Sequence, residues 1–241
     1  MFNDLDIEQY YTTNDDVVNS FFVPLLNEAV QYDRTSAYFS MDSLAAYARG
    51  LEQLVLNNGH CRLIISYQIS ERDFEAIQKG YSLRTEITEE MLGKLRQETI
   101  TSLQCGISNL AYMIAIGVVD IKIAFMQEGL FHDKVGLLKD RADNWVSFSG
   151  SNNETIAGLH KNHESFTVNC SWWSDENSPF GKGIKKARNI FELLWNNKQP
   201  RVIVKDIPDI IQRELLKYNK GFLVMNQDIA CLLYTSPSPR D

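Results

Sequence analysis

The sequence lacks the features that would place the protein in a membrane or outside the cell. Its longest charge-free apolar run, residues 110–119, is about half of the roughly 20 residues that a membrane span needs. The first residues are acidic rather than basic, and no small-residue cleavage site follows an apolar core, so we expect no secretory signal. The protein is therefore expected to be cytoplasmic.

Cysteine is also scarce, and no C-x-x-C pair occurs. This scatter argues against a zinc site or a disulfide framework and predicts reduced cysteines in the core. A zinc site built from histidines has no cysteine or carboxylate spacing to support it. The four cysteines are Cys61, Cys105, Cys170 and Cys231.

What the chain does contain is enough apolar residue for a sizeable core. It has 241 residues, of which 44% are hydrophobic, so it is long enough for one large domain or two small ones. The net charge of −7 gives no long-range attraction to nucleic acid and mildly opposes it. Any interaction with nucleic acid must therefore depend on local patches.

Residues 231–241 differ in composition from the rest, because serine, threonine and proline crowd into CLLYTSPSPRD. The string resembles the translation of a transposase-based sequencing adapter, so we expect these residues not to be native and the gene to continue past Ala230. A short natural tail is the alternative. The fold is therefore predicted from residues 1–230 alone.

Strands and helices alternate along the chain, which predicts one α/β domain with a mixed sheet covered by helices on both faces. No internal repeat is visible. Alternating or continuous apolar patterns predict strands at residues 34–39, 61–67, 119–125, 134–139, 145–148, 165–170 and 201–204. Helical spacing and capping residues predict helices at residues 25–30, 44–55, 88–116, 184–195 and 207–218, and a short helix that starts after residue 70 and ends at Gly80.

Residues 131–164 carry the polar side chains that point to phosphate chemistry. Side chains two apart on a strand share a face, so His132 and Lys134 are expected to point the same way and to meet one phosphate together. The turn after the next strand, Gly150-Ser151-Asn152-Asn153, is expected to open a helix and to offer hydroxyl, amide and N–H groups to an anion. Glu164 precedes a further strand, where it is placed to orient a histidine ring.

This pattern resembles the motifs of the phospholipase D superfamily. His132-x-Lys134 is similar to its H-x-K motif, and Gly150-Ser151-x-Asn153 to its G-S-x-N motif, with Glu164 beyond them. The strings YDRTSAYFS, LIISYQISERDF and FELLW resemble the phospholipase D-like domains at the N-terminus of prokaryotic DEAD/DEAH-box helicases. The resemblance extends to Ala230, so it implies a phospholipase D-like domain over residues 1–230 and a helicase region beyond.

The resemblance implies a two-step cleavage of phosphodiesters that needs no metal and no cofactor. His132 would form a phosphohistidine, a second histidine would protonate the leaving oxygen, and water would release the enzyme. Lys134, Ser151 and Asn153 would stabilise the added negative charge. Because the chain has a single motif, the resemblance implies a homodimer in which two motifs meet at a two-fold axis.

One position departs from the family pattern. The superfamily has an aspartate where this chain has Lys139, and Asp140 lies one residue later. A shift of one residue on a strand reverses the face. Asp140 is therefore either a turn residue or a substitute that a bulge admits.

Three other groups of residues have simple structural explanations. His160 and His163 are expected on the surface or in a loop, although His163 could line the cleft beside Glu164. Trp172 and Trp173 are expected to pack in the core and at its rim rather than to stack on bases. A basic cluster at the start of a helix is as consistent with a solvated face as with a patch that binds the nucleic-acid backbone. The cluster consists of Lys182, Lys185, Lys186 and Arg188.

The sequence therefore predicts a nuclease-type phosphodiesterase domain of a helicase-linked DNA-processing or defence protein, with DNA favoured over RNA. The first alternative is a module with a weak or inactive site that binds nucleic acid or holds a dimer together. The second is a phospholipid-acting enzyme, which the lack of an apolar interfacial stretch disfavours.

Overall fold

A mixed sheet of eight strands forms the centre of the computed structural model, which describes residues 1–126, 128–212, 216–219 and 222–225. The strand order is β1-β8-β7-β6-β2-β3-β5-β9. Neighbours β2, β3 and β5 run parallel, and the other pairs are antiparallel. The strands are β1 (Tyr10–Thr12), β2 (Ala29–Ser36), β3 (His60–Ser66), β5 (Val119–Met126), β6 (Val135–Asp140), β7 (Trp145–Gly150), β8 (Ser165–Cys170) and β9 (Val202–Asp206).

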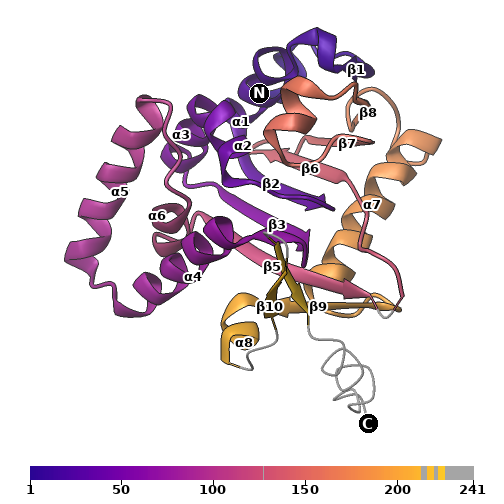
Figure 1. Cartoon of the computed structure of the whole chain (residues 1–241). Helices are drawn as coiled ribbons and strands as arrows, with labels where there is room; N and C mark the ends of the chain where they lie inside the picture. Colours follow the sequence, from indigo (N-terminus) through magenta and orange to yellow (C-terminus); the bar gives the residue numbers. More distant parts are fainter. Residues whose placement is uncertain (127, 213–215, 220–221, 226–241) are drawn as a thin grey trace.

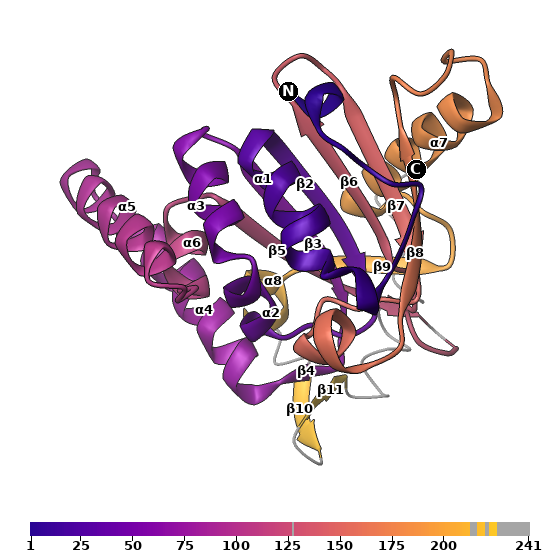
Figure 2. The same ribbon diagram turned by 90° about the horizontal axis from the view of Figure 1, so that it is seen from above.

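Helices cover both faces of this sheet, as the sequence predicts (Figures 1 and 2). One face carries the first six α-helices and the larger apolar core, whereas α7 packs on the other face over a smaller cluster that includes Phe191 and Leu194. Among the described residues, no helix is both long and apolar enough to cross a membrane. The helices are α1 (Val23–Glu28), α2 (Met41–Ala46), α3 (Ala48–Leu56), α4 (Glu71–Glu86), α5 (Glu89–Gln104), α6 (Leu110–Ala115), α7 (Pro179–Trp195) and α8 (Ile207–Gln212).

The predicted strands in the middle of the chain are confirmed to within one or two residues at each end. β3, β5, β6, β7 and β8 follow the continuous or alternating apolar runs. β2 begins earlier than predicted, because Ala29 is buried and pairs with Asp140 of β6. Residues 29–30 therefore belong to the strand, and the helical prediction for them is wrong.

Two helix predictions are wrong at a glycine: one glycine that was expected to end a helix lies inside it, and one that was expected inside a helix interrupts it. Gly80 does not end α4 but lies inside it, where a side chain would come within 2.7 Å of Ile114 Cβ on α6. The predicted helix 88–116 is two helices, α5 and α6, and Gly106 in the break has a positive φ of 73°. Glycine is thus used once for close packing and once for a turn.

The predicted helix 44–55 is also two helices, α2 and α3, separated at Tyr47. The helix predicted at 207–218 is wrong in its second half, since α8 ends at Gln212 and Leu216–Asn219 is strand β10. With β4 (Ile69–Ser70) and β11 (Phe222–Met225), β10 forms a separate three-stranded sheet. Residues 231–241, with Cys231, lie outside the described residues. The other three cysteines are free thiols; Cys61 and Cys170 are buried as predicted, but Cys105 is exposed, so the core prediction is wrong for it.

Candidate functional site

The predicted site residues gather at one edge of the sheet. Strand pairing sets Gly136 of β6 beside Arg34 near the end of β2, Val135 beside Ser149 near the end of β7, and Gly150 beside Phe166 at the start of β8. The segments just outside these strands carry His132 and Lys134, Ser151 to Glu154, and Glu164 respectively. The antiparallel register therefore brings three separate segments together at this edge.

His132 and Lys134 contact each other, although the strand on which we expected them begins only at Val135. The Lys134 Nζ lies 3.0 Å from Nδ1, 3.2 Å from Nε2 and 3.3 Å from the carbonyl oxygen of His132. His132 is exposed, whereas the Lys134 side chain is 7% exposed. An ammonium group carries only donors and a neutral imidazole has one acceptor nitrogen, so Lys134 can donate to only one of the two ring nitrogens.

The charge of Lys134 is held in an environment that disfavours it. Burial lowers the pKa of Lys134, and the nearby Arg34 guanidinium lowers it further. Glu164 and Asp133 act in the opposite direction and raise the pKa, without restoring it to the usual value. A negatively charged group that contacts Lys134 would favour its charged form and oppose the effect of burial.

Ser151 and Asn153 hold the loop together in this structure. Ser151 Oγ accepts a hydrogen bond from the Ser165 N–H at 3.2 Å, and Asn153 Oδ1 accepts one from the Tyr38 N–H at 3.2 Å. The expected helix N-terminus is not at this turn, because the next helical segment is a short π-helix at Ala157–Lys161. The Ser151 N–H also donates to the Ser165 carbonyl, so the prediction of an anion site built from free backbone N–H groups here is wrong in part.

Glu164 lies at the same edge but is not shown orienting His132. Its Oε1 accepts a hydrogen bond from Asn162 Nδ2 at 3.1 Å, and its backbone N–H donates to Thr13 Oγ1. No hydrogen bond joins Glu164 to His132 within the described part of the chain. The effect of Glu164 that the structure supports is electrostatic and acts on Lys134.

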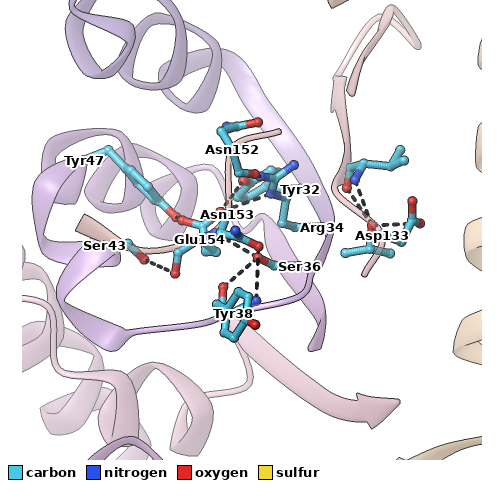
Figure 3. A network of polar contacts seen from close by, with 12 residues as sticks. Tyr32, Arg34, Ser36, Tyr38, Ser43, Tyr47, Asp133, Asn152, Asn153 and Glu154 are labelled. Carbon is cyan, nitrogen blue, oxygen red and sulfur yellow. Dashed lines mark hydrogen bonds and ion pairs between the residues drawn. The ribbon is translucent and has the colours of Figure 1, made fainter. Parts of the chain in front are cut away.

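A buried ion pair behind this edge was not predicted from the sequence (Figure 3). Arg34 Nε lies 3.3 Å from Glu154 Oε2, and both side chains are 1% exposed. Arg34 Nη2 donates to the carbonyl oxygen of Asn152 at 2.6 Å, and its guanidinium lies over the Phe148 ring at 4.8 Å. The pair ties the loop after β7 to strand β2, 120 residues away in the sequence.

Two buried tyrosines complete the environment of Glu154. The hydroxyls of Tyr32 and Tyr47 both donate to its carboxylate, and burial raises the pKa of both phenols well above the usual range. The Glu154 N–H donates to Ser36 Oγ at 2.8 Å, and its carbonyl accepts from Ser43 Oγ and from the N–H of Ser40. The break between α2 and α3 coincides with Tyr47, which reaches this carboxylate.

Two polar groups in the network are buried without a partner among the described residues: Nη1 of Arg34 and the side-chain amide of Asn152. Such groups are rare in folded proteins, because each loses its hydration without a compensating bond. A sequence signal did exist, since an arginine inside a buried strand and a glutamate next to the Gly-Ser turn both suggest internal pairing.

Asp140 is the last residue of β6, at the end opposite the site edge, and its carboxylate holds the turn that follows. Its carboxylate accepts hydrogen bonds from the N–H groups of Phe2, Ala142 and Asn144 and from Asn144 Nδ2, at 2.8–2.9 Å. Burial would raise the pKa of Asp140, but these four hydrogen bonds outweigh it and hold the pKa below the usual value. β2 has an irregularity in register between Ala29 and Gln31, opposite this end of β6.

The basic cluster lies on α7, which packs on the face of the sheet opposite the first six helices, and Lys182, Lys185 and Arg188 line a groove of about 900 Å³. The groove is lined by equal numbers of cations and carboxylates, and Arg188 stacks on Trp145 at 3.8 Å. Asp33 and Glu192 are paired with Arg62, and Asp143 with Lys139, which leaves Lys182, Lys185 and Arg188 with Glu176 in the groove. Its charged lining residues are Lys139, Lys182, Lys185, Arg188, Asp33, Asp143, Glu176 and Glu192.

The tryptophans and the other two histidines considered from the sequence lie in the core or on the surface of the fold. Trp172 packs against the core near Phe2, and Trp173 is 40% exposed. His160 and His163 are exposed. In the part of the chain that the structure describes, no three histidine, cysteine, aspartate or glutamate side chains are grouped so that they could hold a metal ion.

Comparisons with known proteins show no match to a protein-family model and none to a curated protein. Similar solved structures include NucT from Helicobacter pylori (12% identity, 80% of this chain and 98% of that one, TM-score 0.43). Nuc from Salmonella typhimurium, a phospholipase D family member, has 13% identity over 82% and 95%, with a TM-score of 0.46. A polyphosphate kinase from Porphyromonas gingivalis has 9% identity over 95% of this chain and 28% of that chain, with a TM-score of 0.48. At these identities and scores, the likeness carries no argument about function.

Proposed function

We propose that this chain is a phosphodiesterase that cleaves nucleic-acid phosphodiester bonds at His132. The observation that carries the proposal is the contact between Lys134 Nζ and the His132 ring, at 3.0 Å, on the edge where the Ser151 and Glu164 segments converge. A cation beside an imidazole acceptor can hold a phosphate in front of that ring. The motif resemblance points to the same residues.

In the proposed reaction, a nitrogen of His132 attacks phosphorus and forms a P–N bond while the P–O bond to the leaving group breaks. A second histidine gives its proton to the leaving oxygen. The same group then takes a proton from a water whose oxygen attacks phosphorus, so that a new P–O bond forms while the P–N bond breaks and His132 is released. Lys134, Ser151 and Asn153 stabilise the added charge, each by about 2–4 kcal/mol by analogy with oxyanion donors. Ser151 and Asn153 must first exchange their present backbone partners for phosphate oxygens.

The second histidine is proposed to be His132 of a second copy of this chain, because the chain has a single H-x-K motif and His160 and His163 lie outside it. His60 starts β3, and six residues of strand, or about 20 Å, separate it from the edge that carries His132. It is also paired with Asp120 at 2.9 Å. A homodimer with two His132 side chains at a two-fold axis would supply nucleophile and acid together.

The nucleic-acid substrate, with DNA favoured over RNA, and a helicase region after residue 230 are proposed from the sequence resemblance alone. The second candidate is a module that binds nucleic acid or dimerises without cleavage. One observation favours it: the side chains of Ser151 and Asn153 both accept backbone hydrogen bonds that stabilise the loop. A phospholipid-acting enzyme is the third candidate and has no such support.

The test is to incubate the purified chain in EDTA with labelled single-stranded DNA, duplex DNA, RNA and phosphatidylcholine vesicles. We expect the wild type to cleave a nucleic acid. His132→Ala should lower the cleavage rate at least 1,000-fold, by analogy with other catalytic nucleophiles, and His160→Ala, at a matched exposed histidine, should leave the rate unchanged. An adduct on His132, trapped at alkaline pH and found by mass spectrometry, would identify the intermediate. Equal activity in wild type and His132→Ala would refute the proposal, and lipid hydrolysis alone would favour the third candidate.

The dimer has a separate test that uses mixed subunits. If each site needs His132 from both chains, a dimer of one wild-type and one His132→Ala subunit is inactive. The activity of exchanged mixtures should then fall with the square of the wild-type fraction. A linear fall, or full activity of a monomer in light scattering, would contradict a shared site.

A further inference from the structure

Tyr38 places an exposed aromatic ring directly beside His132. The two ring centroids are 6.3 Å apart and the ring planes meet at 86°. The Tyr38 side chain is 38% exposed, although its chain neighbours Ala37 and Phe39 are 0% and 5% exposed. The ring therefore belongs to the surface at the site edge rather than to the core.

The backbone of Tyr38 is held on both sides. Its N–H donates to Asn153 Oδ1 at 3.2 Å, and its carbonyl accepts from Ser36 Oγ at 2.7 Å. Phe39 forms a parallel bridge with Glu154. The residue is thus anchored to the loop that carries Ser151 and Asn153, and Figure 3 shows it beside Ser36 and Asn153. An aromatic ring on an anchored backbone loses little freedom when a ligand stacks on it.

None of these anchoring bonds uses the phenol ring. The backbone of any residue could donate to Asn153 and accept from Ser36, so the network does not explain why an exposed tyrosine stands here. In nucleic acids a base lies one sugar away from each phosphate, and exposed aromatic rings bind bases by stacking on their faces. The Tyr38 ring is close enough to His132 for a base next to a phosphate bound there to reach it.

We propose that Tyr38 forms a base-stacking subsite next to His132, which selects phosphodiesters that carry a nucleobase beside the scissile phosphate. This inference rests on the proposed function and adds a substrate requirement to it. Contacts from Lys134 to phosphate oxygens are the same for every phosphodiester. A ring that stacks on a base, such as that of Tyr38, would distinguish nucleic acid from other diesters.

The test compares two oligomers of equal length and equal phosphate count, one of thymidine and one of abasic tetrahydrofuran units. Alanine substitution at a stacking residue weakens binding by a factor of about 5 to 150 per base. We therefore expect Tyr38→Ala and Tyr38→Leu to lower kcat/KM on the thymidine oligomer by that factor, mainly through KM. Tyr38→Phe should keep wild-type values, and cleavage of the abasic oligomer should change less than twofold in all three variants.

Phe180→Ala is the matched control, because Phe180 is 46% exposed at the start of α7 on the other face. It should behave as wild type on both oligomers. An equal loss on both oligomers in Tyr38→Ala and Tyr38→Leu would show that Tyr38 only supports His132 or the loop, and no loss on either would show that no subsite exists. Both results overturn the inference.

Binding of the same two oligomers, measured by fluorescence anisotropy in a His132→Ala background, separates this inference from the proposed function. If the wild type cleaves nothing but Tyr38→Ala still weakens thymidine binding selectively, the stacking subsite stands and the enzymatic proposal fails. If cleavage occurs and the two oligomers bind and react alike in every variant, the enzymatic proposal stands and the stacking subsite fails.

Discussion

Replacing Glu154 by glutamine removes one charge from the centre of the molecule and keeps the shape of the side chain. Both members of the Arg34–Glu154 pair are 1% exposed, so water cannot solvate the arginine that remains. Breaking a buried pair by removing one partner costs about 3–5 kcal/mol of unfolding free energy. For a domain of this size, that loss lowers Tm by about 6–20 °C.

The contrast with an exposed ion pair makes this prediction specific. Arg62 and Glu192 lie closer together, at 2.6 Å, but Glu192 is 51% exposed. Surface pairs contribute about 0–1 kcal/mol, so Glu192→Gln should change stability by less than 1 kcal/mol despite the shorter distance. Burial rather than distance decides which pair matters, because solvent screens the exposed charge.

The assay is urea unfolding followed by far-UV circular dichroism, with a double-mutant cycle. Arg34→Met alone should also destabilise the fold, because it leaves the Glu154 charge without its cation. The Arg34→Met/Glu154→Gln double variant should lose less than the sum of the single variants, by about 0.5–3 kcal/mol. A Glu154→Gln loss as small as that of Glu192→Gln, or additive single losses, would refute the view that the pair stabilises the loop.

Three further predictions concern single polar groups. The pKa of Asp140 is held below its usual value, so the ionised carboxylate stabilises the fold fully above the unfolded-state pKa near 4, and this stabilisation is lost as the pH falls through the lower folded-state pKa. Asp140→Asn should lower the free energy of unfolding by about 1–3 kcal/mol at pH 7, measured by urea unfolding. The stability of this variant should also fall less than that of the wild type at acid pH. Asn152→Leu should leave stability unchanged or raise it by about 1 kcal/mol, because the buried amide has no partner among the described residues; a loss above 1 kcal/mol would contradict this. Burial and Arg34 lower the pKa of Lys134, so kcat/KM of the wild type should begin to fall at a pH below the usual lysine pKa of 10.5. Arg34→Met should move this alkaline fall to higher pH. Identical pH profiles in the two proteins would exclude an electrostatic effect of Arg34 on Lys134.

The strands β3, β5, β6, β7 and β8 were predictable because each follows a local pattern of apolar residues, whereas β1, β4 and β11 were not predicted and β10 was predicted as a helix. β5 alternates over residues 119–123 and β3 is buried continuously over residues 63–66, so residues close in the sequence carry most of the signal. Helix ends were less predictable, since Gly80 looks like a terminator but serves the packing of α4 against α6. A glycine has the same local signature in both roles, and only its distant neighbours differ.

The candidate site also has one part that the local sequence predicts and another that depends on contacts between distant segments. His132 and Lys134 are two residues apart, and the Gly-Ser turn and Glu164 follow in one short stretch, so spacing and motif resemblance together predicted a phosphate site here. The opposite is true of Arg34 and Glu154, of Asp140 with Phe2, and of Tyr38 with His132, whose partners lie far apart in the chain. Spacing carries no information about contacts between distant segments, because those depend on strand order and register. The pairing of β2 with β6 and of β6 with β7 therefore sets what surrounds His132 and which carboxylate meets the buried arginine.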